Sequence, residues 1–363
     1  MGSVSTLGAA PTTAPVQPLS PALDVFVAGQ EGYHTYRIPS LLVTAKGTLL
    51  AFAEGRKNGR GDSGHIDLVL KRSADNGRTW SALAVVASDP PNTIGNPCPV
   101  VDRATGTIWL PMTRNLGADS ERDIVAGKSK DTRRVLISSS NDDGVSWSRP
   151  VDITASTKLP EWTWYATGPG VGIQLKSGRL LIPCDHRVLG SSKYRSHVIF
   201  SDDHGKNWKL GGVVGEDVNE CQAVELGDRS VMINMRSYRA NQGCRAVSIS
   251  KDGGESWSAI TDDSTLIEPN CQASLVRFGG NETHKPFVLF CNPASQQKRE
   301  KLTLRISGDE GRTWSISKLL YEGSSGYSCL AILPDVTVGC LYERDNYGKI
   351  TYVRVELDSA SRN

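Results

Sequence analysis

The stretch that decides the fold is SADNGRTW at residues 73–80, because four variants of it follow. They are SNDDGVSW at 140–147, SDDHGKNW at 201–208, SKDGGESW at 250–257 and SGDEGRTW at 307–314. The shared form is Ser-x-Asp-x-Gly-x-(Ser/Thr/Asn)-Trp, and we call each copy a box. Five matches to one eight-residue pattern mark an internal repeat. The boxes use five of the eight tryptophans of the chain.

Each residue type in the box suits a tight turn between two strands. The Asp accepts hydrogen bonds from backbone N–H groups further along the turn, and the Gly permits positive φ at the tip. The Trp can pack at the base of the turn against neighbouring strands. The box is therefore predicted to be a β-hairpin turn, and apolar strands are expected before the five boxes at Ile66–Lys71, Arg134–Ser139, His197–Phe200, Ala246–Ile249 and Leu302–Ile306.

A calcium-binding role for the boxes is not favoured. A calcium loop of the EF-hand type needs oxygen ligands at alternate positions, a following Glu and flanking helices, which the boxes lack. No metal ion is predicted here.

The spacing of the boxes predicts the architecture. They begin on average about 58 residues apart, and the chain from Asp24 to Leu357 holds about six such periods. Strand patterns at this period, with almost no helical periodicity, are typical of four-stranded blades around an axis. We therefore predict an all-β fold, a six-bladed β-propeller of four-stranded antiparallel blades, with one blade lacking a box. This domain covers residues 24–363, and residues 1–23, which hold no charged residue, are predicted to be a disordered leader.

Composition excludes some classes of function. Lys and Arg number 41 and Asp and Glu 39, a net charge of +2, which argues against a nucleic-acid partner. No run of apolar residues is long enough for a transmembrane segment. The eight cysteines form no C-x-x-C pair, so no zinc site is indicated. Their even number permits disulfides, but the apolar runs around Cys291 and Cys340 favour buried free thiols.

A short motif near the N-terminus indicates the family. Tyr36-Arg37-Ile38-Pro39 precedes the apolar strand expected at 40–43, and the five boxes follow. This combination, from Gly32 to about Val355, resembles the sialidase (neuraminidase) family. The resemblance implies an exo-α-sialidase that removes terminal sialic acids from glycoproteins, glycolipids and oligosaccharides. It implies retention of configuration through a covalent tyrosyl intermediate, with no cofactor.

Several alternatives to hydrolysis remain open. They are a trans-sialidase, a glycosidase for a related nonulosonic acid, and a non-catalytic propeller that binds glycans or proteins. A secreted or otherwise extracytoplasmic location is expected, with a lysosomal or cytosolic location as the alternative.

The resemblance also implies a set of substrate-binding residues. Planar guanidinium groups match a carboxylate, and the family uses three to hold that of the substrate. The matching residues are Arg37, Arg236 and Arg299, with Arg305 as a weaker candidate for the third. The resemblance further implies Glu343 as the carboxylate that orients Arg37, Arg56 as a partner for a sugar hydroxyl, and Asn96, Trp162, Trp164 and Tyr165 as candidates for the N-acyl and glycerol pockets. Core packing is an equal alternative for the tryptophans, and Asp185-His186-Arg187 is a candidate for the aglycone rim.

The catalytic residues follow from the charge of the substrate. The anomeric carbon of a sialoside bears a carboxylate, which would repel an anionic nucleophile, whereas a neutral phenol assisted by a carboxylate avoids this repulsion. The resemblance implies Tyr327 as the nucleophile and Glu220 as the base that takes its proton. Asp62, between Gly61 and Gly64 on an expected mobile loop, matches the general acid/base.

Overall fold

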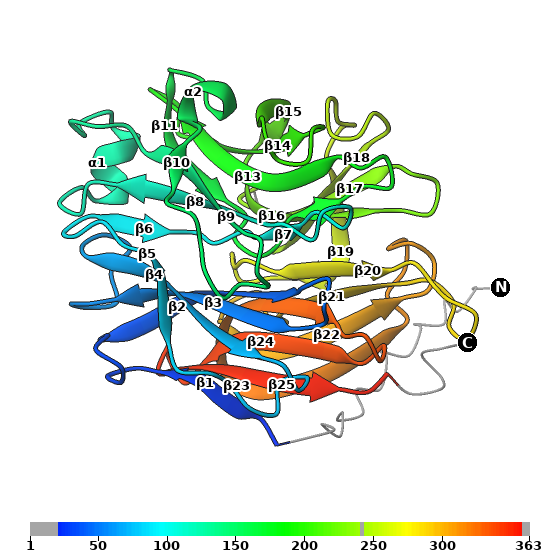
Figure 1. Cartoon of the computed structure of the whole chain (residues 1–363). Helices are drawn as coiled ribbons and strands as arrows, with labels where there is room; N and C mark the ends of the chain where they lie inside the picture. Colours follow the sequence, from blue (N-terminus) through cyan, green and yellow to red (C-terminus); the bar gives the residue numbers. More distant parts are fainter. Residues whose placement is uncertain (1–20, 240–242, 358–363) are drawn as a thin grey trace.

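The computed structural model describes residues 21–239 and 243–357, which are almost entirely β-structure (Figure 1). Only two short helices are assigned in these ranges, α1 (Glu121–Val125) and α2 (Thr154–Thr157). Most of the expected leader, residues 1–20, lies outside the described residues, and Leu23 already belongs to the first strand. No helix in the described ranges is long and apolar enough to cross a membrane.

The described strands pair into six antiparallel units, which we number in chain order. Unit 1 contains β2 (Thr35–Val43), β3 (Leu49–Arg56), β4 (Ile66–Ser73) and β5 (Ala84–Ala87). Unit 2 contains β6 (Thr93–Gly95), β7 (Val100–Val101), β8 (Ile108–Asn115), β9 (Arg134–Ser140) and β10 (Val151–Asp152). Unit 3 contains β11 (Trp162–Thr167), β12 (Ile173–Gln174), β13 (Leu180–Val188), β14 (Tyr194–Ser201) and β15 (Lys209–Glu216).

Unit 4 contains β16 (Val218–Glu225), β17 (Val231–Ser237), β18 (Cys244–Ser250) and β19 (Thr261–Ile267). Unit 5 contains β20 (Ser274–Phe278), β21 (Phe287–Pro293), β22 (Glu300–Ser307) and the first part of the long strand β23 (Ile316–Ile332). Unit 6 contains the second part of β23, β24 (Val338–Arg344), β25 (Lys349–Val355) and β1 (Leu23–Val27). Each unit is four strands wide, because β6 and β7, like β11 and β12, share one edge as two short pieces.

The prediction that the boxes are hairpin turns is confirmed at all five positions. Each box joins the third strand of its unit to the fourth, as in β4 to β5. In the first box Ser73 Oγ accepts a hydrogen bond from Gly77 N at 2.9 Å, and Asp75 Oδ1 accepts one from Thr79 N at 2.9 Å. The same Ser–Gly bond recurs in the other four boxes. The repeated residues therefore stabilise the turn itself.

Each box tryptophan contacts the preceding unit. The contacts are Trp80 on Tyr352, Trp147 on Phe52, Trp208 on Trp109, Trp257 Nε1 to Gly212 O and Trp314 Nε1 to Asp263 Oδ2. The box glycine lies at the same junction. Gly77 has φ +84°, and a Cβ there would lie 2.1 Å from Cε1 of Tyr352. The box thus serves both as a turn and as a contact between units.

The first and last units lie side by side. Strand β1 pairs with β25, and β2 packs against β23 and β24, so the blue and red ends of the described chain meet in Figure 1. This pairing explains why unit 6 has no box. Its third and fourth strands, β25 and β1, come from opposite ends of the chain, so no turn connects them.

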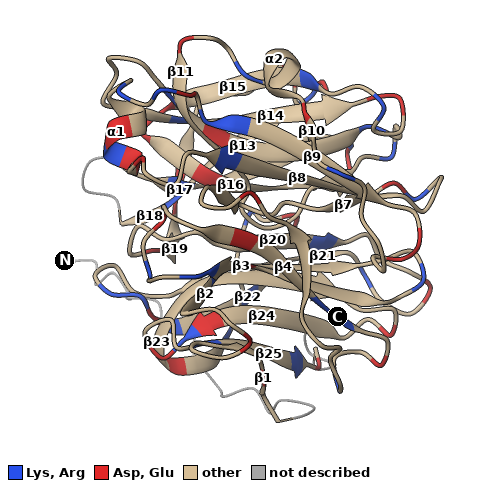
Figure 2. Ribbon diagram, turned by 60° about the vertical axis from the view of Figure 1, so that its left-hand side comes forward, with Lys and Arg blue, Asp and Glu red and all other residues tan. Residues whose placement is uncertain are grey.

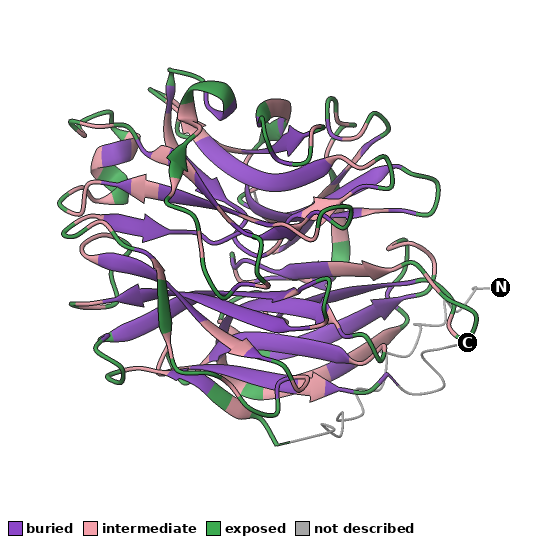
Figure 3. Ribbon diagram, in the orientation of Figure 1, coloured by how far each residue is buried: buried purple, intermediate pink, exposed green. Residues whose placement is uncertain are grey.

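The core lies within and between the sheets. Figure 3 shows buried residues along the strands and exposed residues in the turns. All eight cysteines are buried free thiols, as the apolar runs indicated. In the view of Figure 2, basic and acidic residues are interspersed along the loops, which agrees with the balanced charge.

One sequence expectation differs from the structure. The sequence predicts that the Tyr36–Pro39 motif precedes a strand, but the motif lies inside β2. The pairing of β2 with β3 shifts register between Arg37 and Ser40, and Ile38 adopts φ +59°. This irregularity lies next to the side chain of Arg37, at the cavity described below.

Candidate active site

A cavity of about 230 Å³ brings together side chains from all six units. Eight of the nine predicted site residues line it: Arg37, Arg56, Asp62, Asn96, Glu220, Arg236, Arg299 and Tyr327. The ninth, Glu343, lies behind Arg37. The other lining residues are Ile38, Glu54, Thr93, Glu121, Arg133, Trp164, Ala166, Asp185, Asn219 and Tyr238. Residues up to 290 positions apart in the chain therefore share one site.

Arg37 is held by a buried carboxylate. Its Nε donates to Glu343 Oε1 at 2.6 Å, and the backbone N–H of Ile38 donates to the same oxygen at 2.9 Å. The other oxygen, Oε2, accepts from the backbone N–H of Tyr327 at 2.9 Å. Glu343 has no exposed side-chain surface. One carboxylate thus fixes Arg37 relative to the strand that carries Tyr327.

The other two arginines approach the same tyrosine. Arg236 Nη1 lies 2.9 Å from Glu220 Oε2 and 3.4 Å from the Tyr327 hydroxyl. Arg299 donates to the hydroxyl of Tyr347 at 3.2 Å and to the carbonyl of Asn270 at 3.0 Å. The Cζ atoms of Arg37 and Arg299 lie 5.4 and 5.5 Å from the centre of the Tyr327 ring.

Arg305, the weaker candidate for the third arginine, does not line the cavity and donates to Asn292. Arg37, Arg236 and Arg299 thus come from three different units and surround the phenol of Tyr327. This arrangement is suited to binding a carboxylate.

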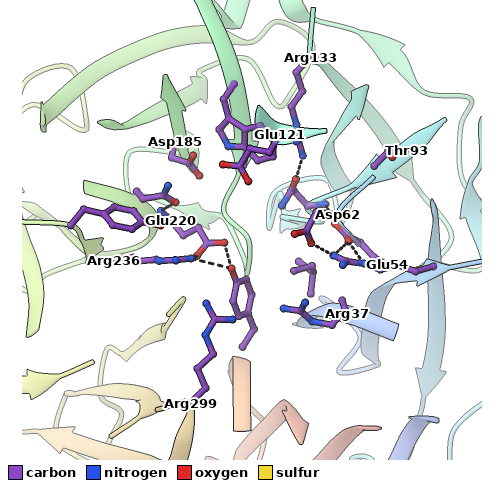
Figure 4. A pocket seen from close by; sticks show the side chains of 18 residues that line it. Arg37, Glu54, Asp62, Thr93, Glu121, Arg133, Asp185, Glu220, Arg236 and Arg299 are labelled. Carbon is purple, nitrogen blue, oxygen red and sulfur yellow. Dashed lines mark hydrogen bonds and ion pairs between the residues drawn. The ribbon is translucent and has the colours of Figure 1, made fainter. Parts of the chain in front are cut away.

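Tyr327 and Glu220 form the central pair of the cavity. The Tyr327 hydroxyl donates to Glu220 Oε1 (Figure 4). Burial and the charge of Glu220 raise the pKa of Tyr327 well above its usual value, against the opposing effect of Arg236 and Arg299. The phenol is therefore neutral near pH 7, and the carboxylate is in position to accept its proton.

Asp62 lies across the cavity from Glu220 (Figure 4). It belongs to the loop between β3 and β4, and its side chain is 66% exposed. Asp62 Oδ1 lies 2.7 Å from Arg56 Nη2, which also contacts Glu54 Oε2 at 2.6 Å. Loss of solvent raises the pKa of Asp62, but the charges of Arg56 and Arg37 outweigh it, so the pKa lies below its usual value. The ligand-free carboxyl is therefore ionised near pH 7.

A polar wall faces Arg37 and Arg299 from the opposite side of the cavity (Figure 4). We call Glu121, Arg133, Trp164 and Asp185 the far wall. They come from α1, the residue before β9, β11 and β13. The guanidinium of Arg133 lies over the Trp164 ring at 3.8 Å. The far wall supplies polar groups at the end of the cavity opposite Arg37 and Arg299.

The aromatic candidates divide between the cavity and the core. Trp164 lines the cavity, whereas Trp162 and Tyr165 are buried in the core of unit 3. Of the proposed rim, Asp185 lines the cavity and Arg187 does not. His186 is buried against Trp162, with ring centres 3.4 Å apart.

Sequence reasoning missed several lining residues, including Glu54, Glu121, Arg133 and Tyr238. Glu54 carried a usable signal, because it is a carboxylate that directly follows the apolar stretch 49–53 of β3. Arg133 and Glu121 carried none, because they lie between β8 and β9, Glu121 at the start of the short helix α1, and neither belongs to a repeated motif.

Comparison with known proteins agrees with this architecture. A family model described as a BNR repeat-like domain matches residues 47–340. A sialidase of Micromonospora viridifaciens is 36% identical, in an alignment that covers 93% of this chain and 54% of that protein. Mouse sialidase-2 is 34% identical, covering 94% of this chain and 97% of that protein.

A solved structure is similar over the same range. The Hadza microbial sialidase Hz136 has a TM-score of 0.85 and 32% identity, covering 93% of this chain and 68% of that one. The chain spans about half the length of the Micromonospora protein and nearly all of the mouse protein. On the domain match and on these identities over most of its length, the chain belongs to the sialidase family.

Proposed function

We propose that this protein is a retaining exo-α-sialidase that hydrolyses terminal sialic acids from glycoproteins, glycolipids and oligosaccharides. The observation that carries the proposal is the hydrogen bond from Tyr327 to Glu220 in a cavity where three arginines meet. A phenol paired with a carboxylate is the nucleophile suited to an anomeric carbon that itself bears a carboxylate. The names of the relatives, including the sialidases of Micromonospora and mouse, support the same activity.

The fold that we propose for this activity is a closed six-bladed β-propeller. Support comes from the six units, from the box tryptophans that join each unit to the one before, and from the packing of unit 1 on unit 6. The pairing of β1 with β25 would close the ring between the two ends of the chain. Closure matters for function because Arg37 and Tyr327 come from the two units that meet there.

Substrate binding follows from the charges in the cavity. Arg37, Arg236 and Arg299 would hold the substrate carboxylate, with Glu343 fixing the first of them. Arg56 and Asn96 would contact oxygens of the sugar ring. The carboxylate would partly neutralise the positive charge that lowers the pKa of Asp62, so binding raises the fraction of Asp62 that carries a proton.

The first chemical step forms the covalent intermediate. Protonated Asp62 gives its proton to the glycosidic oxygen, and the bond from that oxygen to the anomeric carbon breaks. Tyr327 Oη attacks the anomeric carbon from the other face while Glu220 takes the phenolic proton. The leaving alcohol departs, and the sugar remains attached through an aryl ether oxygen.

The second step releases the sugar. Ionised Asp62 removes a proton from water, whose oxygen attacks the anomeric carbon, and the bond to Tyr327 breaks. Glu220 returns its proton to the phenolate. Two inversions give net retention, and both carboxyl groups regain their starting protonation states.

The expected substrates are displayed on cell-surface and extracellular glycans. The proposal therefore includes a secreted or otherwise extracytoplasmic location.

The experiment is release of free sialic acid from α2,3- and α2,6-sialyllactose, followed by ¹H NMR from the first minutes. The α-anomer should form first and then mutarotate. First appearance of the β-anomer would contradict retention, and no release from either substrate would contradict the activity. An aryl α-sialoside donor with excess lactose distinguishes hydrolysis from transfer, because a trans-sialidase would form sialyllactose, which is absent from that starting mixture.

A further inference from the structure

Arg299 is held differently from the other two arginines of the cavity, which each pair with a carboxylate. Within the described residues Arg299 forms no ion pair. Its Nη1 donates to the hydroxyl of Tyr347 at 3.2 Å, and its Nη2 donates to the backbone carbonyl of Asn270 at 3.0 Å. In that part of the chain, the Tyr347 hydroxyl is thus the one side-chain group that accepts a hydrogen bond from this guanidinium.

The same tyrosine contacts Arg37. The guanidinium of Arg37 lies over the Tyr347 ring, with Cζ 3.9 Å from the ring centre. A cation in this position is attracted by the face of the ring. The ring also lies close to the residue before the proposed nucleophile, since a Cβ added at Gly326 would be 3.0 Å from Tyr347 Cε1. Tyr347 therefore contacts two of the three arginines and lies against the strand that carries Tyr327.

The backbone holds Tyr347 in an unfavourable conformation. It belongs to the turn between β24 and β25, where three consecutive residues other than glycine have positive φ: Asp345 at +54°, Asn346 at +52° and Tyr347 at +67°. Asp and Asn adopt this left-handed region more readily than other residues, whereas it is rare for a bulky residue such as Tyr. Strain of this kind persists where the surroundings hold the residue in place, and it is concentrated at functional sites. The contacts of Tyr347 with the two arginines are such surroundings.

We infer that Tyr347 is a positioning residue that holds Arg37 and Arg299 at one spacing, so that both guanidinium groups reach the carboxylate of the substrate. This inference rests on the proposed sialidase activity. Tyr347 is not among the residues that line the cavity, so it acts on the substrate only through the two arginines. Its ring restrains Arg37 and its hydroxyl restrains Arg299. An arginine that is fixed before binding loses less conformational entropy when it holds a ligand.

A phenol suits this position better than a carboxylate. Arg37 and Arg236 each already have a carboxylate partner, so Arg299 supplies the positive charge that remains for the substrate. A carboxylate in place of the Tyr347 hydroxyl would offset that charge and repel the carboxylate of the substrate. The hydroxyl instead accepts a hydrogen bond from Arg299 while it adds no negative charge.

The test measures the binding of two ligands that differ only at the carboxylate. One is the 2,3-dehydro-2-deoxy analogue of sialic acid, which has no glycosidic bond to cleave, and the other is its neutral C1 carboxamide. Kd is measured by ligand-observed NMR titration, which follows weak as well as tight binding. The variants are Tyr347→Phe, which keeps the ring and loses the hydroxyl, and Tyr347→Leu, which loses both.

The two ligands should respond differently. Tyr347→Phe should raise Kd of the acid about tenfold, the effect of losing a hydrogen bond to a charged group, and change Kd of the carboxamide by less than about threefold. Tyr347→Leu should raise Kd of the acid about fivefold more, because the ring no longer packs on Arg37. A merely structural role predicts that both ligands lose affinity to the same extent, since a loosened cavity does not discriminate by charge.

Steady-state kinetics give a second measurement. The substrate carboxylate is bound in the ground state and in the transition state alike. With a sialyllactose as substrate, KM of Tyr347→Phe should therefore rise while kcat stays within about twofold of wild type.

A double-mutant cycle shows whether the hydroxyl acts through Arg299. In an Arg299→Met background, Tyr347→Phe should change Kd of the acid by less than about twofold, since the donor to the hydroxyl is absent. The matched control is Tyr352→Phe, in the same unit and outside the cavity, which removes a hydroxyl that donates to the carbonyl of Asn76 at 3.2 Å. It should change neither Kd.

Three results would overturn the inference while leaving the sialidase activity standing. They are equal changes in Kd for both ligands, no change for either, and the full effect of Tyr347→Phe in the Arg299→Met background. A wild-type protein that binds the acid no better than the carboxamide would contradict the proposed function, and the inference with it. A wild-type protein that binds the acid but cleaves no sialoside would contradict the proposed activity alone, because the Kd comparison would still decide the role of Tyr347.

Discussion

Glu343 and Arg37 form a buried ion pair in which Oε1 and Nε are 2.6 Å apart, and the second oxygen of Glu343 accepts from the backbone of Tyr327. One carboxylate therefore links a residue proposed to bind the substrate carboxylate to the proposed nucleophile. The two strands involved, β2 and β23, come from opposite ends of the chain. The distance between Arg37, which would bind the substrate, and Tyr327, which would attack it, thus depends on the contact between the first and last units.

Glu343→Gln should weaken this link. The neutral amide leaves the buried guanidinium of Arg37 without a full countercharge, so we expect a loss of about 2 kcal/mol in the free energy of unfolding. KM for a sialoside should rise about tenfold, because Arg37 is no longer fixed toward the substrate. Chemical denaturation and steady-state kinetics measure the two effects. The exposed Glu322→Gln is the control, and equal behaviour of the two variants would contradict the role of Glu343.

Tyr327→Phe and Asp62→Asn should each reduce turnover of a sialyllactose by about 100-fold or more, since each removes a group that moves a proton or forms the intermediate. The two variants should differ with an activated leaving group. A fluorogenic aryl sialoside needs little acid assistance, so Asp62→Asn should recover much of its activity on that substrate and Tyr327→Phe should not. Near-normal turnover of sialyllactose by both variants would contradict the assignment.

The pH dependence should respond to Arg56. The charge of Arg56 lowers the pKa of Asp62. In the free enzyme, Asp62 therefore loses the proton that it needs as general acid while the pH is still acidic, as the pH rises. The profile of kcat/KM reports the free enzyme, and it should fall on going from acid to neutral pH. In Arg56→Gln the pKa of Asp62 rises, so the falling limb should move to higher pH. A limb that stays in place would show that another group controls it.

Replacing a box glycine with alanine should destabilise the protein for two reasons, the strain of a positive φ and a clash with neighbouring side chains. Gly77→Ala meets Tyr352 in the adjoining unit, whereas Gly29, with φ +81°, has nothing within 4 Å of the position that a Cβ would occupy. Gly29→Ala should therefore cost about 1–2 kcal/mol from backbone strain alone. Gly77→Ala should cost about 1–3 kcal/mol more from the clash. Urea denaturation of both variants measures the difference, and equal losses would argue against a role of the box in joining units.

The features predicted best from the sequence are those that depend on residues close together in the chain. The five boxes repeat one turn chemistry, so all five hairpins and the strands before them could be assigned from single stretches of sequence. The pairing of β1 with β25 has no local signal, because the two strands are not joined by a turn. The bulge at Ile38 was also missed, since an apolar residue at positive φ is stabilised there by Glu343, far away in the chain.

The site was predictable only where residues belong to a motif. Arg37, Tyr327 and Asp62 lie in short stretches that resemble a family, and the structure brings them to one cavity. Arg133 and Glu121 lie between β8 and β9, Glu121 at the start of α1, and neither belongs to a motif that would place it in the cavity. Trp162 and Trp164 are two residues apart, yet one is buried in the core and the other faces the cavity. Sequence alone does not separate them, because Trp162 and Tyr165 bracket a register shift in β11.

The most direct test of the central claim is to trap the covalent intermediate. Incubation with a 2,3-difluorosialic acid, followed by proteolysis and tandem mass spectrometry, identifies the modified residue. A tyrosine nucleophile predicts one adduct per chain on Tyr327, none in Tyr327→Phe, and slow recovery of activity as the adduct hydrolyses. An adduct on Glu220 or Asp62, or full turnover by Tyr327→Phe, would contradict it.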